Sequence, residues 1–250
     1  ISECLVGSEM CIETDVYGYN LQDQAKELVC ENFYDNNKEI RIPLDPQKTA
    51  RENSQKYFDK YGKLKRTSEA LEVQLAETKA QIDHLESIQN SLNIALSADD
   101  LVQIKEELME YGFIKKHKHG KKQKIKSKPF HYISSDGYDM YVGKNNYQND
   151  ELTFKFATGN DWWFHAKGIP GSHVVVKTEG KELPDRTFEE AGRLAAYYSK
   201  GREQEKVEID YVQKKQVKKP AGAKPGFVVY YTNYSLMIDS DISGIEKISD

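Results

Sequence analysis

Cysteine is scarce in this 250-residue chain, and long apolar runs are absent. The three cysteines, Cys4, Cys11 and Cys30, all lie in the first thirty residues, and their spacing matches no zinc motif. An odd number of early cysteines argues against a disulfide framework and for a reducing, cytoplasmic compartment. No stretch approaches the ~18 apolar residues that span a bilayer, so no membrane partner is expected.

Sequence motifs for nucleotide binding and nucleophilic catalysis are missing as well. The chain contains no P-loop, no G-x-G-x-x-G and no G-x-S-x-G. Ser172 and His173 are adjacent, so on a strand they point to opposite faces and cannot form a Ser–His pair. We therefore expect a protein that is not an enzyme and needs no cofactor.

Two histidines, His165 and His173, raise the alternative of a metal site. A hairpin centred on Ile169 would place them opposite each other, on one face with Trp163. A zinc or iron site needs a third ligand, and Asp161 is the only nearby candidate. We expect no metal, although a metal-dependent enzyme that uses both histidines stays open as an alternative.

The most regular pattern in the chain is a heptad stripe. Twelve positions from Tyr57 to Leu96 alternate in steps of four and three, and nine of them are apolar. The pattern predicts a coiled-coil helix that starts at a Thr49–Glu52 capping box. A second helix is expected from an N-cap at Ser97, folding back onto the first, and residues 26–45 predict a β-hairpin.

Positive charge is concentrated in one block, KKHKHGKKQKIKSK at residues 115–128, which holds eight lysines and no acidic residue. The block lies between the predicted helices and residues 129–250. Such a block is either a solvated linker or a site that binds polyanions by releasing their counterions.

Residues 129–250 predict a compact α/β domain with a mixed sheet, so the fold class is α+β. We expect a hairpin turn at Asp136-Gly137 and helices from Asn149 and from a Thr187–Glu190 capping box. Strands are expected at residues 131–135, 138–143, 162–167, 172–177, 206–212 and 226–233.

The polar and aromatic side chains of this region suit an RNA-binding surface. Lysines bind phosphates, amides bind sugars and base edges, and aromatic rings stack on bases. The predicted RNA-binding residues are Lys115, Lys116, Lys118, Lys121, Lys122, Asn145, Asn146, Gln148, Asn149, Trp163, His165, Lys167, Ser172, His173, Lys200, Lys218, Lys219 and Lys224.

Residues 14–250 resemble one known family. The run YISSDGYDMYVGKNNYQNDELTFKFATGNDWWFHAKGIPGSHVVVK, with VQKKQVKKPAGAKPG, is similar to the NFACT RNA-binding domain. The upstream NFYDNNKEIRIPLDPQKTARENSQKYFDKYGKLK resembles the middle coiled-coil region of bacterial NFACT proteins, which are also called fibronectin-binding protein A-like and associated with RqcH-type ribosome quality control.

The resemblance implies a binding function on the large ribosomal subunit, with its rRNA and also tRNA as partners. It also implies that the full-length protein appends C-terminal alanine tails to stalled chains. Because the chain begins with Ile1, we expect an N-terminally truncated piece whose stripe pairs with a missing coiled-coil arm or self-associates. A cell-surface adhesin that binds fibronectin stays open as the alternative function.

These interpretations divide the chain into five parts. Residues 1–25 give no interpretable pattern, and residues 1–11 are a candidate artefact of sequence joining. The others are the hairpin at the predicted coiled-coil tip, the coiled-coil helices, the basic linker and the RNA-binding domain, at 26–45, 46–114, 115–128 and 129–250.

Overall fold

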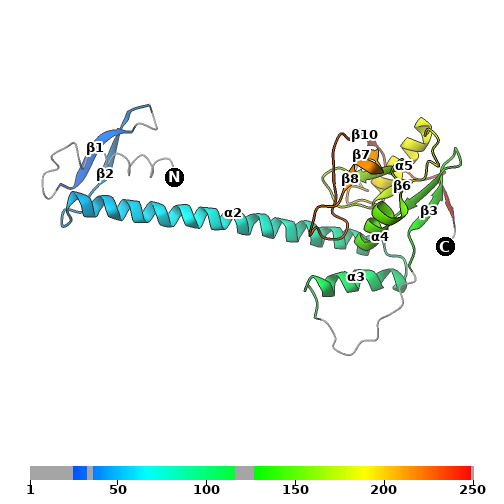
Figure 1. Cartoon of the computed structure of the whole chain (residues 1–250), viewed down its shortest axis with the longest axis horizontal. Helices are drawn as coiled ribbons and strands as arrows, with labels where there is room; N and C mark the ends of the chain where they lie inside the picture. Colours follow the sequence, from blue (N-terminus) through cyan, green and yellow to red (C-terminus); the bar gives the residue numbers. More distant parts are fainter. Residues whose placement is uncertain (1–24, 33–35, 116–126, 249–250) are drawn as a thin grey trace. The chain divides into compact units, whose positions relative to one another are not determined.

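The computed structural model describes residues 25–32, 36–115 and 127–248 (Figure 1). These residues form two compact units, which divide between Lys79 and Ala80 inside the long helix α2 (Ala50–Ile94). The described part of the first unit holds a β-hairpin and most of α2. The second holds the end of α2 and the elements that follow, so the predicted boundary between the coiled-coil helices and the RNA-binding domain does not coincide with the division into units.

The hairpin of the first unit pairs β1 (Glu27–Asn32) antiparallel with β2 (Lys38–Pro43). Leu28 and Ile42 are buried in a small cluster on one of its faces. The predicted hairpin at 26–45 is therefore confirmed.

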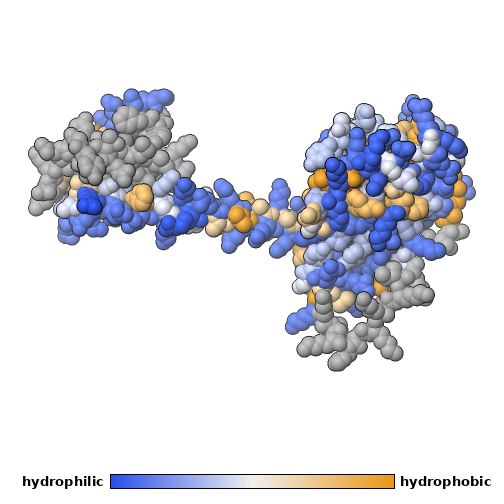
Figure 2. All heavy atoms as spheres, in the orientation of Figure 1, coloured by the Kyte–Doolittle hydropathy of each residue, from blue (hydrophilic) through white to orange (hydrophobic). Residues whose placement is uncertain are grey.

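Helix α2 begins at the predicted capping box. The Thr49 backbone N–H donates to the Glu52 carboxylate at 2.8 Å, and the Glu52 N–H donates to Thr49 Oγ1 at 3.2 Å. The predicted apolar stripe is largely exposed, with Leu71 at 58% and Leu75 at 72%; Figure 2 shows isolated apolar side chains among hydrophilic ones along the helix. Because no described element covers these leucines, the coiled-coil partner stays a prediction.

The last turns of α2 bury a different face within the second unit. His84 and Ile88 are buried, whereas the stripe residues Ile82 and Leu85 remain exposed. The Asn90 side-chain amide donates to the Tyr198 carbonyl at 3.2 Å. One face of the helix end is thus buried in the second unit, while the apolar stripe on another face remains exposed.

Helix α3 (Ala98–Glu110) starts at the predicted N-cap Ser97, which forms a capping box with Asp100. It folds back onto α2, as predicted. The contact includes a buried hydrogen bond from His84 Nε2 to Glu107 Oε1 at 2.8 Å.

The core of the second unit is a seven-stranded sheet in the order β10-β7-β5-β6-β4-β3-β11. All neighbouring strands run antiparallel, so the prediction of a mixed sheet is wrong. The strands are β3 (Phe130–Ile133), β4 (Asp139–Val142), β5 (Trp162–Ala166), β6 (Val174–Val176), β7 (Val207–Gln213), β10 (Tyr234–Ile238) and β11 (Glu246–Ile248).

Helical crossovers explain why the sheet is antiparallel. α4 (Asn146–Glu151) and the π-helical turn η1 (Leu152–Phe156) connect β4 to β5, while α5 (Asp185–Tyr197) connects β6 to β7. Each crossover skips one strand, so the parallel strands that it joins are never neighbours.

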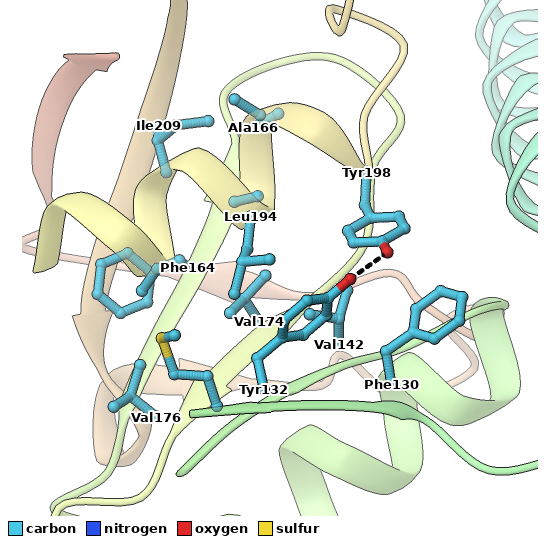
Figure 3. Close-up of a cluster of buried hydrophobic side chains, with 14 of the residues drawn as sticks. Phe130, Tyr132, Val142, Phe164, Ala166, Val174, Val176, Leu194, Tyr198 and Ile209 are labelled. Atoms are coloured by element: carbon cyan, nitrogen blue, oxygen red, sulfur yellow. Dashed lines mark hydrogen bonds between the residues drawn. The ribbon is translucent and has the colours of Figure 1, made fainter. Parts of the chain in front are cut away.

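Both faces of the sheet are covered, one of them only in part. α5 covers one face and packs on a cluster that includes Phe164 and Leu194, and within it the Tyr132 and Tyr198 hydroxyls are 2.6 Å apart (Figures 1 and 3). On the other face, Leu152 of η1 packs in a second cluster. That cluster also receives side chains from the antiparallel pair of β8 (Val217–Lys218) and β9 (Val229–Tyr230). Of the predicted strand at 226–233, only β9 forms.

The predicted turn at Asp136-Gly137 is confirmed, and Gly137 adopts φ +82°, a conformation that favours glycine. The predicted capping box at Thr187–Glu190 is wrong, because α5 already starts at Asp185. Thr187 Oγ1 instead donates to Asp136 Oδ2 at 2.8 Å, and Glu190 accepts from the Ser135 N–H at 2.8 Å. These two residues fasten the β3–β4 turn to α5.

Candidate nucleic-acid interface

The β5–β6 hairpin has the predicted register. Trp163 lies opposite Val175, which centres the turn on Ile169. The His165 and His173 rings are edge to face with centroids 5.4 Å apart, and the Trp163 ring contacts both. The predicted juxtaposition of the two histidines is confirmed.

Trp163 and His173 are nevertheless buried, with 0% and 1% of their surface exposed. The prediction that they are presented on a surface for base stacking is wrong. It assumed a sheet with one open face, whereas η1 and the β8–β9 hairpin cover this one. His165 is half-buried against Trp163, with ring centroids 5.6 Å apart.

Burial also determines the charge of the two histidines. It lowers the pKa of His165 to about 4 and the pKa of His173 well below its ordinary value, because desolvation penalises the protonated ring. Both rings are therefore neutral near pH 7 and provide no positive charge for phosphates. His173 Nδ1 lies 2.8 Å from Thr153 Oγ1, which holds the ring in the interior. In the described part of the chain, no three His, Cys, Asp or Glu side chains gather as a metal site would require.

The predicted amide residues are buried too, and they join α4 to α3. Asn145 is the N-cap of α4 and donates to Gln103 Oε1 at 3.0 Å, so α4 starts three residues earlier than predicted. Gln148 donates to the same oxygen at 3.1 Å. Asn146 donates to Glu107 Oε1 at 2.9 Å. The prediction that these amides face RNA is wrong, because their hydrogen-bonding groups are used inside the protein.

Two further predicted residues serve the same interior. The side-chain oxygen Asn149 Oδ1 accepts from the His173 backbone N–H at 3.0 Å, and Ser172 Oγ donates to the Gly143 carbonyl at 2.6 Å. Both side chains are buried. They fix the β4–α4 connection against β6 and are not exposed to a ligand.

The predicted lysines lie at the surface, but several are paired. Lys167 Nζ is 2.6 Å from Glu208 Oε1, Lys200 Nζ is 2.8 Å from Glu86 Oε1, and Lys219 is paired with Asp150. Lys224 Nζ lies 5.7 Å from the centre of the Tyr111 ring. Lys218 and Lys115 are exposed. Four predicted linker residues lie outside the described residues: Lys116, Lys118, Lys121 and Lys122.

A basic surface forms around η1 and includes Lys155, which the sequence did not predict as an RNA contact. The amines of Lys214 and Lys219 lie 5.7 and 6.0 Å from the centre of the Phe154 ring, and Lys155 is exposed on the same turn. We call Lys155, Lys214 and Lys219 the η1 lysines. The alternation of aromatic and basic residues in Phe-Lys-Phe at 154–156 was the signal available for Lys155.

The backbone holds the segment after β7 against the turn that follows η1. The Lys214 N–H donates to the Asp161 carbonyl at 2.8 Å, and the Lys215 N–H donates to the Gly159 carbonyl at 3.1 Å. The lysines of this segment are therefore presented on a fixed backbone next to η1, where they can contact successive phosphates of a nucleic acid.

The comparisons with known proteins agree with this geometry. Residues 15–127 match the NFACT N-terminal and middle domains, and residues 128–232 match the NFACT protein RNA-binding domain. The chain belongs to the NFACT family. The η1 lysines lie in its RNA-binding domain.

This NFACT chain matches part of two longer relatives. It is 43% identical over 230 residues to "Rqc2 homolog RqcH" of Streptococcus pneumoniae, covering 92% of this chain and 40% of that protein. It is 33% identical over 69 residues to "Ribosome quality control complex subunit NEMF" of Homo sapiens, covering 27% of this chain and 6% of NEMF. The chain thus spans less than half of the RqcH relative.

A solved structure has the same fold. It is the C-terminal part of the fibronectin/fibrinogen-binding protein from Streptococcus suis, with a TM-score of 0.72 and 42% identity, covering 80% of this chain and 81% of that one. The name of that protein refers to fibronectin, but the RNA-binding domain and the RqcH and NEMF relatives do not favour an adhesin here.

Proposed function

We propose that this chain binds ribosomal RNA of the large subunit through the η1 lysines and the basic linker, as part of a ribosome quality-control factor. The observation that carries the proposal is the position of Lys214 and Lys219 over the Phe154 ring, with the exposed Lys155 next to Phe154 in the chain, within the RNA-binding domain. Lysines at a rigid surface bind the RNA backbone irrespective of sequence, and each phosphate contact releases counterions.

The longer protein carries the rest of the proposed function. The name of the NEMF relative refers to ribosome quality control, and for the longer protein we propose the rescue of stalled translation in the cytoplasm. In the full-length protein, binding of the obstructed large subunit and of tRNA would accompany C-terminal alanine tailing. This chain contributes the RNA-binding domain and the middle region to that assembly.

The proposed role is binding and not catalysis. The best candidates for acid–base chemistry are His165 and His173, whose rings both pack against Trp163; His173 also contacts Thr153 of η1 and is buried. Their position supports a structural role. The peptide-bond chemistry of such a complex would then belong to the ribosome.

Co-sedimentation of the chain with purified large ribosomal subunits tests this function. The double variant Lys155→Ala/Lys214→Ala should lower the bound fraction severalfold, since each lost phosphate contact removes a favourable electrostatic contribution. The matched control is Lys167→Ala/Lys206→Ala: Lys206 precedes β7, and Lys167 follows β5 and pairs with the same end of β7, about 20 Å from Lys214 along the strand.

The control pair should sediment like the unchanged chain. Equal losses in both double variants would show that only net charge matters, and no sedimentation of the unchanged chain with large subunits would refute the function itself. Because Lys167 was a predicted contact, the control also tests that prediction.

A further inference from the structure

The face of the sheet that η1 covers is left partly open over β3 and β4. The covering layer ends at Phe156, which is 41% exposed. Next to it, His131 of β3 and Tyr141 of β4 are cross-strand partners that are only half-buried. This open end of the layer forms a pocket of about 520 Å³, a size typical of small-ligand sites.

Aromatic rings dominate the pocket. His131 and Tyr141 stack in parallel, with centroids 4.5 Å apart and an interplanar angle of 5°. Phe156 contacts Tyr141 edge to face, with centroids 4.7 Å apart. The arrangement is fixed by a hydrogen bond from His131 Nε2 to Asp139 Oδ1 at 2.6 Å. Such a group of rings offers stacking surface to a planar ligand.

Charged groups line the same pocket. Lys128 and Lys155 are exposed, and neither forms an ion pair with a carboxylate among the described residues. Glu151 is the acidic residue of the lining. Two cations beside stacked rings match the phosphates and the base of a nucleotide, while a carboxylate can accept from an exocyclic amino group.

We propose that this pocket holds one unstacked nucleotide of bound RNA. The base stacks against Phe156 and the His131–Tyr141 pair, and the flanking phosphates contact Lys128 and Lys155. Glu151 favours adenine, cytosine and guanine, which carry an amino group, over uracil, which does not. The proposal rests on the proposed RNA-binding function and adds a specific subsite to it.

Fluorescence of a single-stranded oligonucleotide with one 2-aminopurine tests the subsite in the full chain. Stacking in the pocket should change the emission on binding. Phe156→Ala should weaken single-strand binding by about fivefold to 150-fold, the range measured for one stacked base, and Phe156→Tyr should restore it. Binding to an RNA duplex of equal length should stay within twofold, because paired bases cannot enter the pocket.

The control removes an exposed phenylalanine elsewhere: Phe227 is 57% exposed, and Phe227→Ala should leave single-strand binding unchanged. Phe156→Leu provides a second variant that keeps apolar packing on Tyr141 but has no aromatic face. Glu151→Gln should equalise the affinities for oligo(A) and oligo(U), because an amide both donates and accepts.

The possible outcomes separate the two proposals. If Phe156→Ala and Phe156→Leu leave single-strand binding unchanged, or weaken single strands and duplex equally, the nucleotide pocket is wrong. Salt-dependent binding through the η1 lysines would then still stand. If the unchanged chain binds neither RNA, both the pocket and the proposed function are refuted.

Discussion

The replacement Trp163→Ala tests whether the β5–β6 hairpin is part of the protein core or binds RNA. Trp163 is 0% exposed and contacts three rings, those of His165, His173 and Tyr230, at centroid distances of 5.6, 5.0 and 5.1 Å. Truncating a buried tryptophan to alanine costs about 3–5 kcal/mol of unfolding free energy. The three ring contacts place the expected loss in the upper part of that range.

Urea denaturation measures this loss. With a slope of about 3 kcal/mol/M, the midpoint should fall by about 1–2 M. Trp162, the other of the two tryptophans, lies in the same unit and reports its unfolding by fluorescence. Phe227→Ala, at an exposed position, should change the unfolding free energy by no more than about 0.5 kcal/mol.

RNA affinity completes the test. Trp163→Phe keeps a ring in the core, so its affinity for rRNA should stay within twofold of the unchanged chain. A tenfold loss of affinity in Trp163→Phe with an unchanged urea midpoint would refute the core assignment and restore the hairpin as an RNA contact.

Three other perturbations probe the interior that supports this surface. The pKa of His165 in the folded chain is depressed to about 4, so the unfolded chain binds the proton first as pH falls. The unfolding free energy should therefore decrease by up to about 3 kcal/mol between about pH 6.5 and 4. In urea melts a His165→Gln variant should show a smaller decrease, and an equal decrease would contradict the burial of a neutral His165. Lys144→Met leaves the buried Asp100 carboxylate without the ammonium that lies 3.2 Å away. Thermal melts should show that the unfolding free energy falls by about 3–5 kcal/mol. A decrease under about 1 kcal/mol would mean that Asp100 does not need this partner. Gly143→Ala places a Cβ against Asn149 Oδ1 and 3.0 Å from its backbone nitrogen, so the unfolding free energy should fall by about 1–3 kcal/mol. The comparison is Gly159→Ala, where the nearest atom lies 3.7 Å from the added Cβ; equal losses would show that the collision is not the cause.

Local signals in the sequence predicted local structure well. The turn residues at Asp136-Gly137 and the position of Ile169 specified two hairpin registers, because each strand pairs with the next through a short connection. The Thr49–Glu52 capping box and the N-cap at Ser97 are likewise local signals, whereas the capping box predicted at Thr187–Glu190 did not form. These patterns need no knowledge of the distant chain.

Burial of the second sheet face could not be predicted in the same way. It depends on η1 and on the β8–β9 hairpin, which come from segments on either side of β5 in the sequence. The side chains of Trp163 and His173 therefore looked available for RNA. The apolar runs Trp-Trp-Phe and Val-Val-Val, without alternation, were the available sign that these strands are covered on both faces.

The prediction that the amide side chains face RNA failed for a related reason. Asn145, Asn146 and Gln148 find their partners about forty residues upstream, in α3. A polar residue in a predicted loop has no local feature that tells an internal hydrogen bond from an exposed group. The same limit concealed the pocket at His131 and Tyr141, whose rings are brought to Phe156 only by the fold.

The salt dependence of RNA affinity tests the central claim most directly. Binding of large-subunit rRNA should be measured from 50 to 200 mM salt for the unchanged chain, for Lys155→Ala/Lys214→Ala and for Lys167→Ala/Lys206→Ala. If the η1 lysines neutralise two phosphates, the slope of log K against log salt should become less steep by about 1.5 in the first variant and stay unchanged in the control. An identical slope in all three proteins would contradict the assignment of RNA binding to this surface.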